Sequence, residues 1–145
     1  TNPNHKNGRR LIVLAWNPGN ADISKLPPCN YTFAFNVLGN KLNCHLTQRS
    51  GDIALGIPFN LACYSLLTML IAKECGYEVG EFAHTIIDAH IYENHIDGLK
   101  EQLTREPLKL SKIKIADKPF NELTFEDIKL EDYESQPLIK FEVAI

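Results

Sequence analysis

Two alternating runs of residues, joined by a short turn, constrain the fold of this chain more than any other feature. Over residues 31–37, tyrosine, phenylalanine and valine alternate with smaller or polar side chains, and over 42–48 leucine and cysteine alternate with polar ones. A period of two is typical of strands with one buried face. Gly39 and Asn40, between the runs, suit a tight turn. The sequence therefore predicts a β-hairpin over 31–48.

The segments on either side of the hairpin predict an α+β fold with more sheet than helix. A continuous apolar run over 11–16 suits a buried strand. Residues 58–75 predict a long helix, with Pro58 in its first turn and Gly76 as its C-cap. Because apolar residues nearly encircle this helix, we expect it to be buried, with a mixed β-sheet packed against it. The other expected elements are an extended segment over 79–92, an amphipathic helix over 94–106, and short strands over 110–115 and 138–143.

The composition is that of a globular protein. The chain's 145 residues suffice for one domain with its own core, and 44% hydrophobic with 23% charged residues is not the composition of a disordered chain. A net charge of −3 gives no reason to expect nucleic acid or an anionic membrane as partner. The longest apolar run, over 61–72, is too short to span a bilayer, and no signal peptide is expected from the polar first residues.

The four cysteines predict a reducing compartment and one exposed thiol. Their spacing fits neither a zinc site nor a small disulfide scaffold, so we expect a cytoplasmic protein without a metal. Cys44 and Cys63 are expected to be small buried hydrophobic residues in a strand and a helix, and Cys75 to lie near a helix end. Only Cys29, after the Pro27-Pro28 turn, stands where a thiol can be presented to a ligand.

Polar residues downstream of Cys29 could complete a site around its thiol. A nearby cation lowers the pKa of a thiol and makes it reactive, and Arg49 after the hairpin could supply that cation. The run Arg49-Ser50-Gly51-Asp52 is rich in donors and suits a phosphate, although such a run is more often an ordinary polar turn. Asn60, in the first turn of the expected helix, offers the donor and acceptor that match the N3–H and O4 of uracil.

The remaining polar motifs are less specific. His90 and Tyr92 fall on one face of an extended segment, where they hold a sugar hydroxyl or form local hydrogen bonds. Arg9-Arg10, before the first strand, is either a solvated basic end or an anion site. The other histidines have no metal-ligand spacing and are interpreted as structural or surface residues: His5, His45, His84 and His95.

Together these motifs resemble the thymidylate synthase family, in order and approximate spacing, over essentially the whole chain. The motifs are Arg9-Arg10, Pro27-Pro28-Cys29, the run from Gln48 to Asp52, the run from Gly56 to Asn60, the run from Asp88 to Tyr92, and the terminal Val143-Ala144-Ile145. The resemblance implies that residues 1–145 form one thymidylate synthase-like domain that lacks the N-terminal part of the family fold.

The resemblance also implies a reaction and a role for each motif. Cys29 would add to C6 of the uracil of dUMP, and 5,10-methylenetetrahydrofolate would supply a methylene group and a hydride to give dTMP and dihydrofolate. The implied dUMP contacts are Arg9, Arg10, Gln48, Arg49, Ser50, Asp52, Asn60, His90 and Tyr92, with the two arginines reaching the partner's site in a homodimer. The implied folate contacts are Asp52 and Ala144.

Three positions depart from the family's common pattern. Asn30 stands where histidine is commonest, and Ile86-Ile87 where two glycines are usual. The family's N-terminal half carries a further phosphate-binding arginine, a proton-relaying glutamate and folate-contacting tryptophans, none of which can be located here. General acid–base catalysis supplies about two to four orders of magnitude in rate, so the resemblance implies that this chain alone is inactive or nearly so.

Two alternative functions stay open from the sequence. The first is a pyrimidine nucleotide hydroxymethylase on the same scaffold, in which water rather than hydride quenches the methylene group. Asn60 favours uracil over cytosine as the base, because a cytosine-directed site is expected to carry a carboxylate there. The second is a non-catalytic fragment that binds a nucleotide or dimerises.

Overall fold

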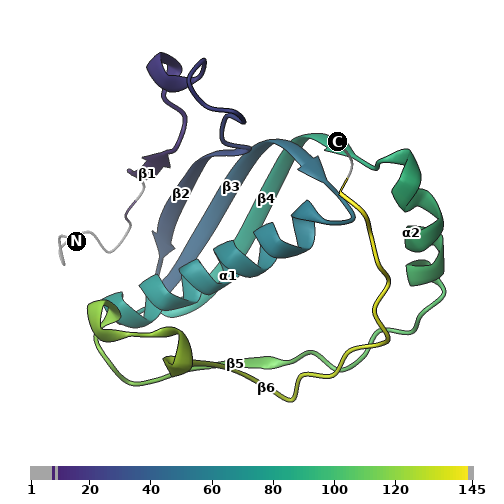
Figure 1. The fold of residues 1–145 in the computed structure, drawn as a ribbon. Helices are drawn as coiled ribbons and strands as arrows, with labels where there is room; N and C mark the ends of the chain where they lie inside the picture. Colours follow the sequence, from purple (N-terminus) through teal and green to yellow (C-terminus); the bar gives the residue numbers. More distant parts are fainter. Residues whose placement is uncertain (1–7, 9, 144–145) are drawn as a thin grey trace. The chain divides into compact units, whose positions relative to one another are not determined.

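Residues 11–90 contain a four-stranded sheet with one long helix across its face (Figure 1). The computed structural model describes Gly8 and residues 10–143, which divide into two compact units at the boundary between His90 and Ile91. The sheet has the order β1-β2-β3-β4. Its strands are β1 (Leu11–Leu14), β2 (Asn30–Leu38), β3 (Lys41–Asp52) and β4 (Glu78–His90), and the helix α1 spans Gly56–Cys75.

The predicted hairpin is confirmed as β2 and β3. These strands pair antiparallel from Asn30↔Gln48 to Leu38↔Lys41, and the chain turns between them through Gly39, which has a φ of 62°. Their helix-facing side chains form the core with Ala72 of α1: Phe35, Val37, Leu42 and Cys44. The alternation in the sequence therefore corresponds to one buried face of the sheet. The predicted burial of Cys44 is also confirmed.

The helix α1 is the connection between two parallel strands. β3 and β4 pair in parallel from Lys41↔Glu78 to Asp52↔His90, and parallel neighbours need a crossover of about a dozen residues or more. β2 runs antiparallel to β3, so Asn30 at its start lies beside the end of β3. We call this place the carboxyl end of the sheet: it holds the last residues of β3 and β4, the start of β2 and the start of α1.

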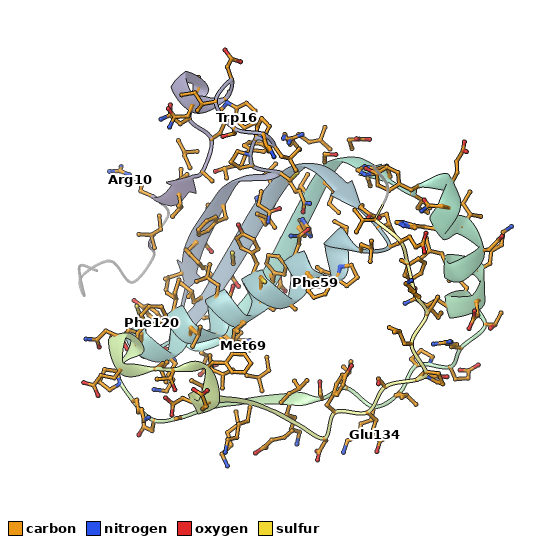
Figure 2. The ribbon with its side chains drawn as sticks, in the orientation of Figure 1. Arg10, Trp16, Phe59, Met69, Phe120 and Glu134 are labelled. Carbon is orange, nitrogen blue, oxygen red and sulfur yellow. The ribbon has the colours of Figure 1, made fainter. Side chains whose placement is uncertain are left out.

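The prediction of a buried long helix is wrong. In α1 only Thr68 and Ala72 are buried, Cys63 is exposed against expectation, and Phe59 is 72% exposed (Figure 2). Apolar residues do surround the helix, but the sheet covers only one side of it, and burial requires a partner on each side. By length and composition α1 could cross a membrane, yet a helix packed on a sheet passes the same test.

Residues 11–14 of the predicted run over 11–16 form the strand β1, but this strand is not buried. Its exposed fractions range from 39% at Leu11 to 70% at Leu14. Among the strands that the structure describes, β1 is an edge strand paired with β2, whereas α1 packs chiefly on β3 and β4. A continuous apolar run is typical of a strand covered on both faces, and the described residues do not cover this one.

The second unit is smaller and has less regular structure. It contains a single-turn helix (Glu93–His95), α2 (Ile96–Leu103) and the antiparallel pair β5 (Lys112–Ile115) and β6 (Ile128–Glu131). The extended segment predicted over 79–92 is confirmed up to His90, and the predicted helix over 94–106 and strand over 110–115 are confirmed with shorter bounds.

A strand over 138–143 is not found. The backbone of this segment is held by side chains instead of a strand partner, because the carbonyl of Glu142 accepts hydrogen bonds from His95 Nε2 at 2.7 Å and from Asn94 Nδ2 at 3.2 Å. The ring of Phe141 also lies edge-on to His95, with ring centroids 5.3 Å apart.

Candidate functional site

The topology brings most of the predicted site residues to the carboxyl end of the sheet. Cys29 immediately precedes β2, and the run from Gln48 to Asp52 closes β3. Asn60 lies near the start of α1, and His90 is the last residue of β4. Residues as far apart in the chain as Cys29 and His90 therefore meet at one place because β3 and β4 are parallel.

Arg49 is tied to the turn that carries Cys29. Its guanidinium donates from Nε to the carbonyl of Pro28 at 3.1 Å and from Nη2 to the carbonyl of Pro27 at 2.7 Å. Its backbone N–H donates to the carbonyl of Cys29 at 2.9 Å. A guanidinium has five N–H donors, so these contacts leave others for an anion. The arrangement brings a permanent positive charge to the turn that holds the thiol.

Gln48 links β3 to the helix through Asn60. The Gln48 side chain is buried, at 2% exposure, and its Nε2 donates to Asn60 Oδ1 at 3.1 Å and to the carbonyl of Ser50 at 2.8 Å. On the β4 side, Gln48 Oε1 lies 2.8 Å from His84 Nε2. The half-buried amide of Asn60 is thus held in one orientation by a neighbour, which is what recognition of a planar base edge needs.

The ends of β3 and β4 are joined by hydrogen bonds around Asp88. Ser50 Oγ donates to Asp88 Oδ2 at 3.3 Å, and His90 Nδ1 lies 3.5 Å from the same oxygen. Asp52 Oδ1 accepts from the N–H of Ala54 at 2.9 Å and so shapes the turn into α1. These polar side chains are partly exposed and within reach of a bound molecule.

The close packing at Gly51 explains a glycine in the middle of this polar run. A Cβ atom at this position would lie 2.6 Å from Ile57 Cδ1 and 3.3 Å from Gln48 Nε2. Because such separations are shorter than van der Waals contact, any other residue would displace Ile57 or the Gln48 amide. Gly51 therefore lets the strand approach α1 closely.

Of the predicted residues in the first unit that the structure describes, Arg10 is not brought to this place. Arg10 precedes β1, and Leu11 pairs with Phe35, which lies roughly 20 Å from Cys29 along β2 at about 3.3 Å per residue. Arg10 is exposed and points away from the sheet (Figure 2). Tyr92 belongs to the second unit. Arg9 and Ala144 lie outside the described residues.

The departures from the family pattern fall within regular structure. Asn30 begins β2 opposite Gln48, and its side chain is hydrogen-bonded to Tyr64 of α1. The Asn30 Oδ1 atom is buried and accepts no hydrogen bond from any residue that the structure describes. Ile86 and Ile87 continue β4, with Ile86 paired to Gln48. Bulkier residues than glycine are therefore accommodated here by ordinary strand geometry.

Sequence reasoning missed His84 and Asp88 as parts of this arrangement. Both lie on β4 with the same parity as His90, so a period-two count along that strand would have placed them on the helix-facing side. Their contacts with Gln48 and Ser50 depend on the parallel register between β3 and β4, which the sequence does not reveal. Within 8 and 10–143, no group of three or more metal-ligating side chains is found.

Comparison with known proteins assigns the family. The sequence pattern described as thymidylate synthase matches residues 2–145. The chain belongs to the thymidylate synthase family. It is 53% identical over 147 residues to the thymidylate synthase of Listeria monocytogenes serotype 4a (strain HCC23), covering 100% of this chain and 46% of that protein.

Other members of the thymidylate synthase family give the same result. The chain is 54% identical over 138 residues to the Mycoplasma pneumoniae thymidylate synthase, covering 94% of this chain and 48% of that protein. It is 41% identical over 188 residues to the Haloferax volcanii thymidylate synthase, covering 95% of this chain and 55% of that protein. The chain therefore spans about half the length of the curated relatives it matches.

Proposed function

We propose that the protein represented by this chain is a thymidylate synthase, which reductively methylates dUMP to dTMP with 5,10-methylenetetrahydrofolate. The observation that carries this proposal is the pair of contacts from Arg49 to the carbonyls before Cys29. They bring a candidate anion-binding cation from β3 to the turn that carries a candidate nucleophile. The family membership and the names of the relatives support the same reaction.

The proposed chemistry begins with the Cys29 thiolate. The thiolate adds to C6 of uracil, and the electron pair of the C5–C6 double bond becomes an enolate at C5. C5 forms a bond to the methylene carbon of the folate as one of that carbon's two bonds to folate nitrogen breaks. Loss of the C5 proton with cleavage of the second carbon–nitrogen bond then leaves an exocyclic methylene and tetrahydrofolate. Hydride from the folate then reduces that methylene to methyl while the C6–sulfur bond breaks, giving dTMP, dihydrofolate and the free thiolate.

The contacts of the carboxyl end support a division of binding roles. Arg49 and Ser50 would hold the dUMP phosphate, because a guanidinium and a hydroxyl together match its oxygens. Asn60, held by Gln48, would donate and accept at the pyrimidine edge. His90 and Tyr92 would bind the ribose hydroxyl, and Asp52 and Ala144 would contact the folate.

The position of Arg10 supports a homodimer. Arg10 precedes the first residue of β1, which lies far from the carboxyl end of the sheet. Arg10 is therefore not close to Cys29 of its own chain. We propose that Arg9 and Arg10 bind the phosphate in the partner's site, with two subunits packed through the sheet face opposite α1. The proposed compartment is the cytoplasm, where the four cysteines, free in the structure, would stay reduced.

Residues 1–145 expressed alone are proposed to be inactive or nearly so. The proton-relaying and folate-contacting groups of the family's N-terminal half have no counterpart in this sequence. Efficient turnover by residues 1–145 would contradict this part of the proposal.

The test of the reaction uses the full-length product of the reading frame that contains this chain. Incubation with dUMP and methylenetetrahydrofolate should raise the absorbance of dihydrofolate as dTMP forms. Hydroxymethyl-dUMP without dihydrofolate would instead identify a hydroxymethylase. Binding of dUMP without either product would identify a non-catalytic nucleotide-binding protein.

A further inference from the structure

The buried amide of Gln48 has its hydrogen-bonding groups engaged. The two hydrogens of its Nε2 go to the carbonyl of Ser50 at 2.8 Å and to Asn60 Oδ1 at 3.1 Å. A backbone carbonyl can only accept, so the Ser50 contact assigns the nitrogen of the amide without ambiguity. The remaining atom, Oε1, then faces His84 Nε2 at 2.8 Å and must accept from it. The imidazole of His84 therefore carries its hydrogen on Nε2.

This arrangement limits what Asn60 can present to a base. While Gln48 Nε2 donates to it, Asn60 keeps its oxygen toward Gln48, and rotation of the Asn60 amide by half a turn would set two N–H donors against each other. A donor left unpaired in a buried place costs about 1–3 kcal/mol. The two orientations of the Asn60 amide match different bases. Uracil offers N3–H and O4, whereas cytosine offers an N3 without hydrogen and an amino group.

We propose that His84 is a positioning residue that, by holding the Gln48 amide, keeps Asn60 in the orientation that reads uracil and rejects cytosine. This inference rests on the proposed function, in which Asn60 contacts the pyrimidine. Without an N–H from His84, the buried Oε1 of Gln48 loses its donor, and the restraint on Gln48 and then on Asn60 weakens.

The surroundings of His84 suit this role. Its ring stacks on Phe82, with centroids 5.8 Å apart and planes at 29°. His84 pairs with Leu46 on β3, two residues before Gln48, so the strand register sets its distance from the amide. Burial, and to a lesser degree the nearby His45, lowers the pKa of His84, so the neutral ring with a single N–H prevails near pH 7.

The test measures nucleotide discrimination in the full-length protein. For wild type and each variant, the dissociation constants of dUMP and dCMP are compared. His84→Phe keeps the ring but removes the N–H, and it should reduce the preference for dUMP by roughly tenfold. His84→Gln retains an amide donor and should keep most of the preference. Phe82→Leu removes the ring that stacks on His84 but keeps the N–H of His84. It should lower thermal stability and leave the preference for dUMP unchanged.

Two outcomes would overturn the role of His84. One is an unchanged preference in a folded His84→Phe variant, and the other is an equal loss of preference in Phe82→Leu, which would indicate packing alone. If wild type itself binds no dUMP, the proposed function fails, and the specificity role fails with it.

A second measurement needs neither nucleotide nor a variant. The ¹⁵N chemical shifts of His84 report which ring nitrogen carries the hydrogen, and the Nε2–H tautomer is expected near pH 7. The Nδ1–H tautomer would contradict the hydrogen-bond arrangement itself, whether or not the proposed function is correct.

Discussion

The two ends of β3 share one alternation of side chains but have opposite surroundings. At the first end, Leu42, Cys44 and Leu46 face α1 and are almost fully buried. At the carboxyl end, Gln48 and Ser50 continue the same face, but their neighbours are polar and hydrogen-bonded. One strand therefore serves as core over its first half and as a candidate site over its second. The period of two along a strand decides which face of the sheet a residue occupies. The side chains of other elements that pack on this face decide whether it forms core or a candidate site.

The two cysteines at these ends give the largest expected contrast. Burial raises the pKa of the Cys44 thiol, with a partial offset from its hydrogen bond to Thr68, so Cys44 stays a neutral packing group. In the full-length protein, Cys29→Ala should reduce dTMP formation by at least about 1000-fold without lowering thermal stability. Cys44→Ala should retain activity and lose about 1 kcal/mol of unfolding free energy. Equal losses of rate in Cys29→Ala and Cys44→Ala would contradict the different roles assigned to these two cysteines.

The apolar end should dominate the stability of the unit. Leu46 is completely buried, at 0% exposure, and Leu46→Ala should cost about 2–5 kcal/mol of unfolding free energy through lost burial and a residual cavity. Leu38, 70% exposed at the end of β2, provides the matched control, and Leu38→Ala should stay within about 0.5 kcal/mol. Urea denaturation of both variants measures the difference, and similar costs would contradict the assigned core.

Gly51→Ala tests the close packing between the carboxyl end of β3 and the helix α1. Its Cβ would lie 2.6 Å from Ile57 Cδ1, so displacement should cost about 1–3 kcal/mol. Gly19 is the control, because a Cβ there would meet only Asn17 Oδ1, at 3.4 Å. Thermal unfolding should separate the two alanine variants. A Gly51→Ala variant as stable as Gly19→Ala would show that the strand need not approach α1 this closely.

The smallest expected effect is a pH dependence from His84. Burial lowers its folded pKa below the ordinary value, so the unfolded chain binds more protons between the folded pKa and about 6.5. Stability should therefore rise with pH through this window and fall as pH drops through it. Titration of the His84 ring by NMR checks the direction. A midpoint above 6.5 would reverse the sign and contradict the burial of this ring.

Local patterns predicted the hairpin and the helix, because each depends on neighbours in the chain. The alternation over 31–48 gave β2 and β3, and Gly76, with a φ of 70°, ends α1 as the sequence indicated. The beginning of the helix was placed at Pro58, whereas the first helical residue is Gly56. Propensity alone does not fix such a boundary within two residues.

Burial and long-range contacts could not be predicted in the same way. The exposure of α1 and β1 depends on what covers them, and a residue's own hydrophobicity does not report this. The contact between His84 and Gln48 depends on a parallel register set by a helix of 20 residues. The motifs located the candidate site, but its internal hydrogen bonds required the packed structure.

The most direct test of the central claim identifies which cysteine bonds to the nucleotide. The full-length protein is incubated with 5-fluoro-dUMP and methylenetetrahydrofolate, digested, and its peptides are analysed by mass spectrometry. We predict a covalent ternary adduct on the peptide that contains Cys29, because fluorine at C5 prevents the proton loss that completes the reaction. An adduct on Cys44, Cys63 or Cys75, or no adduct in a protein that binds the nucleotide, would contradict the account.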